Sequence, residues 1–150
     1  MADIVDPATR SRMMAGIRGT NTQPELSIRR ALHRLGFRYS LRTAKTPGKP
    51  DIAFPSRRAA VFVNGCFWHG HDCRLFRLPA TREEFWRAKI ERNRARDAIV
   101  TKLLADAGWR QLIVWECAIR GKNRSIEPVI ELAADWLRNG QENTEIRGES

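Results

Sequence analysis

The feature that most restricts the fold is the segment at residues 64–73, NGCFWHGHDC, because it concentrates side chains that bind metals. It holds two of the three cysteines and two of the three histidines of the chain. The remaining cysteine, Cys117, ends the apolar run LIVWEC much further along. For these residues to share one site, the fold must place the end of the run LIVWEC next to residues 64–73. We therefore expect residues 64–73 and Cys117 to lie together.

The residue types in this set match a structural zinc site, which uses four Cys and His ligands in a tetrahedron. Cys66, Cys73 and Cys117 supply three ligands, and His71 completes the set if His69 is left free. The spacing fits His69 as the ligand equally well, and buried free thiols with solvated imidazoles are the interpretation without a metal. Disulfides are disfavoured, because three cysteines cannot form a closed set and the chain shows no export signal.

Periodicity predicts a mixed α/β domain with helices packed on a small central sheet. Helices are expected over residues 23–35, 82–107 (with a possible break) and 126–137. Strands are expected over residues 37–42, 51–54, 59–64 and 110–117. Thr22 and Thr81 are the expected helix N-caps, each followed three residues later by a glutamate that would complete a capping box.

Three parts of the chain differ in character. Residues 1–20 are weakly patterned and are expected to form an arm, and residues 21–138 form the domain. Residues 139–150 are polar and are expected to be disordered. The composition, 42% hydrophobic and 29% charged, is ordinary for a soluble protein. Without a secretory signal or an apolar run that could cross a membrane, we expect a cytoplasmic protein.

The charge indicates a polyanionic partner. The net charge is +10, with 22 Arg against 5 Lys, and residues 74–96 alone contain eight Lys or Arg and three Glu. Arginine presents a planar fork that suits phosphates and guanine edges. Nucleic acid is the usual partner of such a domain, although charge can also serve solubility alone.

Four residues are candidates for catalysis. Asp51 follows Pro50 at the start of a strand, where a carboxylate can bind Mg²⁺ or simply begin a turn. Glu25 is explained by its capping box, and Asp97 could pair with a neighbouring arginine on a solvated helix face. His69, if the metal site leaves it free, can accept a proton near pH 7.

Phe67 and Trp68 stand between Gly65 and Gly70 in a polar loop. Such a pair usually packs on the core. Beside a phosphate-binding surface, it can instead act as an apolar wedge that enters a base stack.

From about residue 8 to 138, the chain resembles the very short patch repair (Vsr) DNA mismatch endonucleases. The resemblance is carried, in order, by ATRSRMM, PGKPDI, NGCFWHGHDC, LPATREEFW and LIVWECAIRG. It implies a restriction-endonuclease-like core with a structural zinc site. It also implies a Mg²⁺-dependent nick in double-stranded DNA, 5′ to the T of a T·G mismatch that arises when 5-methylcytosine deaminates. The protein would act as a monomer in the bacterial cytoplasm, at the nucleoid, and would be linked functionally to a cytosine-5 DNA methyltransferase.

The resemblance also implies roles for the catalytic candidates. Asp51 and the backbone carbonyl of Val63 would bind Mg²⁺. His69 would be the catalytic histidine with Asp97 as its partner, and Glu25 would assist at the metal or water. Val63 stands where threonine is usual in the family, but a backbone carbonyl does not depend on the side chain.

The remaining implied roles concern zinc and DNA. Phe67 and Trp68 would insert beside the mismatch, with Met14 and Ile17 approaching from the other groove. Asn64 stands where histidine is familiar; it can donate a hydrogen bond to phosphate but cannot exchange a proton near pH 7. The implied zinc ligands are Cys66, His71, Cys73 and Cys117.

Two other functions are compatible with these residues. One is a nicking or restriction-type nuclease with relaxed mismatch choice, and the other is a non-catalytic, zinc-stabilised DNA-binding module. The Pro50–Asp51 pair together with a spare His69 favours an enzyme.

Overall fold

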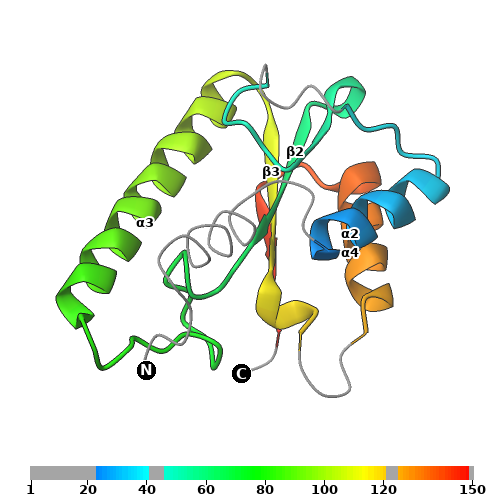
Figure 1. Ribbon diagram of the computed structural model, residues 1–150. Helices are drawn as coiled ribbons and strands as arrows, with labels where there is room; N and C mark the ends of the chain where they lie inside the picture. Colours follow the sequence, from blue (N-terminus) through cyan, green and yellow to red (C-terminus); the bar gives the residue numbers. More distant parts are fainter. Residues whose placement is uncertain (1–22, 41–45, 121–124, 149–150) are drawn as a thin grey trace, which may run out of the picture.

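The computed structural model describes residues 23–40, 46–120 and 125–148, and it confirms the expected mixed α/β domain (Figure 1). A four-stranded sheet stands between helices on its two faces. In chain order the elements are α2 (Gln23–Arg34), β1 (Ile52–Phe54), the 3-10 turn η2 (Pro55–Arg57), β2 (Ala59–Asn64), α3 (Glu83–Asp106), β3 (Arg110–Trp115), the 3-10 turn η3 (Glu116–Ala118), α4 (Glu127–Asn139) and β4 (Thr144–Ile146).

The sheet topology brings distant parts of the chain to one edge. The strand order is β1-β2-β3-β4, with β1 antiparallel to β2 and the other two pairings parallel. The β2–β3 register runs from Ala59 opposite Arg110 to Asn64 opposite Trp115. Because parallel strands end at the same edge, the loop after β2 and the turn after β3 begin side by side.

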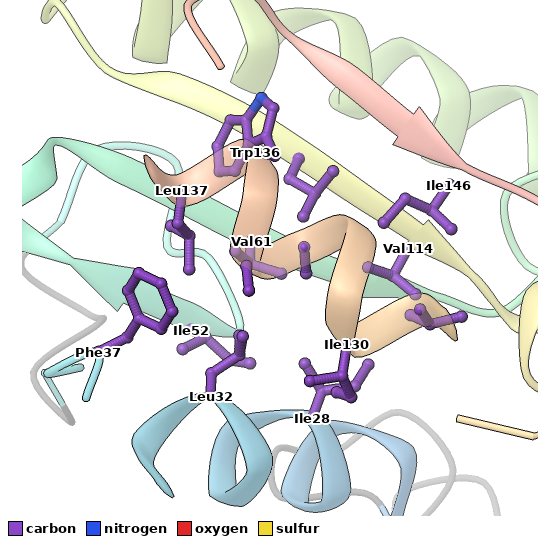
Figure 2. Close-up of a cluster of buried hydrophobic side chains, with 14 of the residues drawn as sticks. Ile28, Leu32, Phe37, Ile52, Val61, Val114, Ile130, Trp136, Leu137 and Ile146 are labelled. Carbon is purple, nitrogen blue, oxygen red and sulfur yellow. The ribbon is translucent and has the colours of Figure 1, made fainter. Parts of the chain in front are cut away.

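The core lies on the sheet face that α2 and α4 cover (Figure 2). The strands contribute Ile52, Phe54, Val61, Leu112 and Val114 to this face, and the helices contribute Ile28, Leu32, Ile130 and Leu137. Successive strand side chains point to opposite faces. Residues such as Phe62 and Gln111 therefore face the other side, toward α3.

The end of α2 follows from the sequence. Ile28 and Leu32 are fully buried one helical turn apart. Gly36 then adopts a left-handed φ of +99°, a conformation that glycine tolerates at a helix end. The expected N-cap, Thr22, lies outside the described residues.

The start of α3 differs from the expectation. Its N-cap is Arg82, in a left-handed conformation and without a side-chain capping bond, so the predicted Thr81–Glu84 capping box is wrong. The left-handed backbone of Arg82 leaves Thr81 outside the helix. The guanidinium of Arg82 instead lies 4.3 Å from the ring centroid of Phe85. From Glu83 the helix runs unbroken to Asp106.

Two strand predictions need correction. In the segment expected over 37–42, residues 37–39 form no strand, Ser40 makes a single bridge to Ala53, and the rest lies outside the described residues. The strand expected over 110–117 ends at Trp115, so Cys117 lies in η3.

The polar tail was expected to be disordered, which is wrong for the residues that the structure describes. Thr144–Ile146 form β4, parallel to β3, and Ile146 is buried in the core. Without β4, strand β3 would present an open edge. The segment is held by its backbone pairing with β3 and by burial of Ile146, although its polar composition is typical of a disordered tail. The domain thus continues past residue 138, whereas the predicted arm at residues 1–20 lies outside the described residues.

None of the described helices combines the length and apolar character that a membrane span requires.

Candidate active site and metal centre

A cleft of about 1120 Å³ opens between α3 and the sheet face away from the core. It gathers the described candidates for catalysis and DNA contact from four separate parts of the chain. Those lining it are Glu25, Asp51, Val63, Asn64, Phe67, Trp68, His69 and Asp97. Met14 and Ile17 lie outside the described residues.

Asp51 lies immediately before β1. Its Oδ2 accepts a hydrogen bond of 2.7 Å from the backbone N–H of Val63, next to it on β2. Burial raises the pKa of Asp51 above its ordinary value, and the Val63 hydrogen bond and the nearby His69 oppose that rise only in part. A cation in the cleft would favour the ionised carboxylate. The position therefore suits a divalent metal ligand.

His69 and Asp97 form a close pair between the loop after β2 and the middle of α3. Nδ1 of His69 lies 2.6 Å from Oδ2 of Asp97. With the proton on Nδ1, the ring donates to the carboxylate and keeps Nε2 as the basic nitrogen. Asp97 thus pairs with His69. The alternative, a pair with a neighbouring arginine on a solvated helix face, is not found in the structure.

Glu25 lies in the first turn of α2 and is almost fully buried, at 3% exposed. It lines the same cleft as Asp51. A capping role alone does not require this location, which places a second carboxylate in the lining of the cleft.

The Cys/His set also comes together. The ligand atoms of Cys66, His71, Cys73 and Cys117 all lie within 4.8 Å of one another, and Cys117 Sγ is 3.6 Å from Nδ1 of His71. A tetrahedral zinc ion places its ligand atoms roughly 3.3–3.8 Å apart. Three sulfurs and one imidazole at this spacing could hold a metal. Of the two histidines left open by sequence, His71 lies with the cysteines and His69 does not.

Burial favours the neutral forms of the Cys66 thiol and the His71 imidazole while no cation is bound. Burial is the largest cause that raises the pKa of the Cys66 thiol, and its cysteine neighbours add to the effect. Burial likewise lowers the pKa of His71, which keeps the imidazole neutral and able to act as a ligand. A bound metal would convert the thiols to thiolates and compensate for their desolvation.

Comparison with known proteins agrees with this geometry. The family model for DNA mismatch endonuclease Vsr matches residues 2–75. The DNA mismatch endonuclease Vsr of Escherichia coli (strain K12) is 42% identical over 138 residues, which is 91% of this chain and 88% of that protein. The type II nicking enzyme V.XorIIP of Xanthomonas oryzae pv. oryzae is 48% identical over 119 residues, 79% of this chain and 88% of that enzyme.

The chain belongs to the Vsr family of DNA mismatch endonucleases. It is therefore an endonuclease.

In this Vsr-family chain, Trp86, Lys89 and Asn93 of α3 contact the loop after β2, and none of these three was predicted. Trp86 packs on both loop aromatics, with ring centroids 5.6 Å from Phe67 and 5.8 Å from Trp68. Nδ2 of Asn93 donates a 2.8 Å hydrogen bond to the carbonyl of Trp68. Residues 86, 89, 93 and 97 share one helix face, so this spacing was a usable signal.

Phe67 and Trp68 are half-buried and touch each other edge to face, with centroids 5.1 Å apart. Both line the cleft while packing on Trp86. Their rings are thus held in place by an aromatic cluster, and insertion into a base stack stays a prediction.

Proposed function

We propose that this Vsr-family endonuclease nicks duplex DNA 5′ to the T of a T·G mismatch in a Mg²⁺-dependent reaction. The observation that carries the proposal is one cleft in which a partly buried carboxylate, Asp51, lies with a paired histidine, His69. The reaction would serve very short patch repair after deamination of 5-methylcytosine.

The Asp51 carboxylate and the Val63 carbonyl are the proposed Mg²⁺ ligands. The hydrogen bond from the Val63 N–H to Asp51 supports this pairing, because it holds the Val63 backbone against the carboxylate. When bound, Mg²⁺ supplies polarisation of the scissile phosphate and stabilisation of the leaving 3′ oxygen.

Protein side chains move the proton and orient the substrate. Nε2 of His69 takes a proton from the attacking water, while Asp97 fixes the ring through Nδ1. Glu25 assists at the metal or water from the α2 side. Asn64 lines the same cleft and donates a hydrogen bond to a phosphate oxygen.

Zinc is the proposed occupant of the Cys/His cluster, held by Cys66, His71, Cys73 and Cys117. The donor set supports this assignment, since three thiolates and an imidazole are typical zinc ligands. Four protein ligands leave no open position, so the role of this zinc is structural.

Mismatch selection would come from the loop between the zinc ligands. Phe67 and Trp68 enter the base stack at the mismatch, where a weakly paired step costs less to unstack. Met14 and Ile17 are proposed to approach from the other groove. The partner is double-stranded DNA, bound by a monomer in the bacterial cytoplasm, at the nucleoid, that acts alongside a cytosine-5 DNA methyltransferase.

The test is a nicking assay with Mg²⁺ on duplexes that carry T·G, each other mismatch, or no mismatch, in varied sequence contexts. We expect one cut, 5′ to the mismatched T. Asp51→Ala should abolish cutting while retaining binding to the same duplex.

Comparable nicking of several mismatches, or of matched DNA, would replace the proposal with relaxed specificity. Binding of T·G duplex without any cut by the wild-type protein would reject catalysis. Full activity of Asp51→Ala would reject the metal ligand.

A further inference from the structure

The chain beyond α4 contacts the Cys/His cluster through side chains and backbone that the proposed function does not use. We infer that residues 144–148, here called the C-terminal strap, are a working part of the metal centre. The strap fixes the orientation of His71 and supports the Cys117 sulfur, and it thereby determines how firmly the cluster retains zinc. This inference rests on the proposed zinc occupancy but not on the proposed T·G specificity.

The first contact joins Arg147 to Asp72, the residue between two proposed ligands. Nη1 of Arg147 donates to Oδ1 of Asp72 at 2.7 Å, and Nη2 donates to the Asp72 carbonyl at 3.0 Å. The same Oδ1 lies 3.7 Å from Nε2 of His71. Nδ1 of that ring faces Cys117. A carboxylate near the far nitrogen of a ligating histidine favours the tautomer with the proton on that nitrogen, which leaves Nδ1 free for the metal.

The second contact is made by the backbone. The N–H of Gly148 donates to Sγ of Cys117 at 3.3 Å, and both residues are buried. A hydrogen bond to a metal-bound thiolate stabilises its negative charge, which is one of the ways a protein tunes a metal site. Because Gly148 covers this sulfur, it also limits access of water.

The third contact acts through Trp115 at the end of β3. The imidazole of His71 stacks on its ring, with centroids 3.9 Å apart and planes 8° from parallel. Nε1 of Trp115 donates to Oε1 of Glu145 at 2.8 Å. The strap thus holds the surface on which the His71 ring rests.

Strand geometry explains why one short segment makes all three contacts. Strand β4 pairs in parallel with β3, with Ile113 opposite Glu145 and Val114 opposite Ile146. Since side chains alternate along a strand, Ile146 enters the core while Glu145 and Arg147 share the opposite face. Core burial therefore anchors the strap, and its polar residues face the metal centre.

The strap is also linked to the proposed active site through the metal cluster. Residues 67–69 stand between the proposed ligands Cys66 and His71, so the cluster fixes both ends of the segment that carries His69. Arg147 and Asp72 are accordingly positioning residues, which act through His71.

The test is zinc transfer from purified protein to a chelating dye, well below the unfolding midpoint. Arg147→Ala, Asp72→Ala and the double variant are compared with Arg30→Ala, an identical side-chain change at an exposed site on α2. We expect each single variant to release zinc roughly tenfold faster, the lower end of what loss of such a partner costs. The double variant should release zinc more slowly than the product of the two single effects predicts, because each single variant already removes the Arg147–Asp72 side-chain pair. Arg147→Lys should recover part of the retention.

Release at the wild-type rate in both single variants would overturn the inference. So would release that rises only in proportion to the global unfolding rate, measured in denaturant for each variant. A protein that contains no zinc, and binds none when zinc is added, overturns the inference together with the zinc assignment. None of these three results bears on mismatch specificity, which the duplex panel decides separately.

Discussion

Asp51 lowers the stability of the metal-free fold when it is ionised, because its pKa is raised in the folded protein. Burial is the main cause of the raised pKa. The folded state therefore keeps the proton to a higher pH than the unfolded chain, in which the ordinary value of 3.8 applies. As the pH rises through this window, the contribution of Asp51 to the free energy of unfolding decreases. Above the window, the ionised group destabilises the metal-free fold.

We expect Asp51→Asn to raise the free energy of unfolding at pH 7 in Mg²⁺-free buffer, by roughly 1 kcal/mol, a gain typical of relieving functional strain. The amide oxygen of asparagine can still accept the Val63 hydrogen bond. Added Mg²⁺ should stabilise the wild type and leave the variant unchanged, because a ligand stabilises only the state that binds it. Urea denaturation measures both effects. A variant that is less stable than wild type at pH 7 would contradict this account of the site.

At the residue scale, candidate site residues could be predicted from local sequence patterns more easily than the side chains that they contact. The Pro50–Asp51 pair indicated a possible metal ligand, and Asp51 does line a cleft. Asp97 looked like an ordinary helix carboxylate, because nothing local connects it to a histidine 28 positions away. The family resemblance implied His69 as its partner, and the packing of α3 on the loop after β2 brings the two side chains to 2.6 Å.

At the scale of elements, the loop at residues 65–73 depends on α3 for its shape. A Cβ at Gly70, whose φ is +61°, would lie 2.7 Å from Cγ2 of Ile90, so this close approach requires glycine. Trp86 and Asn93 hold the aromatic pair from the same helix. The loop is therefore presented to the cleft by a rigid element.

The double variant Phe67→Ala, Trp68→Ala tests this presentation. We expect the ratio of kcat/KM for T·G duplex over matched duplex to fall at least tenfold, because the proposed wedge is lost while phosphate contacts remain. Phe85→Ala is the matched control, since the Phe85 ring contacts Trp86 edge to face, with centroids 5.1 Å apart, but does not line the cleft. Thermal unfolding of each variant separates loss of the wedge from loss of the fold. Unchanged discrimination in a folded double variant would reject the wedge.

Strand β4 shows where reasoning about single elements fails. Residues 139–150 are polar, which is the composition of a disordered tail. The structure of residues 144–146 depends on the edge of β3 with which they pair, a feature of the assembled sheet that composition does not report.

At the scale of the whole molecule, charge controls general affinity for DNA. The net charge of +10 predicts binding that is dominated by phosphate contacts. If six to ten phosphates are contacted, affinity for matched duplex should fall by roughly 10³–10⁵ between 50 and 200 mM salt. Fluorescence anisotropy with the Asp51→Asn variant measures this without nicking.

The aromatic double variant should retain the same slope of log affinity against log salt, because it removes no charge. A shallow slope in the wild-type protein would show that the positive charge serves solubility and not DNA binding.

The sequence by itself determined the kinds of groups available and the local elements. Ligand-type residues, helix periodicity, apolar strand runs and net charge are properties of short segments, so α2, β1, β2, most of α3 and β3, and α4 were predictable. How these groups are brought together depends on the tertiary structure, including the meetings that the family resemblance implied. Parallel pairing of β2 with β3 brings Cys66 to Cys117, the crossing of α3 joins His69 to Asp97, and β4 places the strap beside His71. These contacts follow from strand register and core packing, which many distant residues fix together and no local pattern encodes.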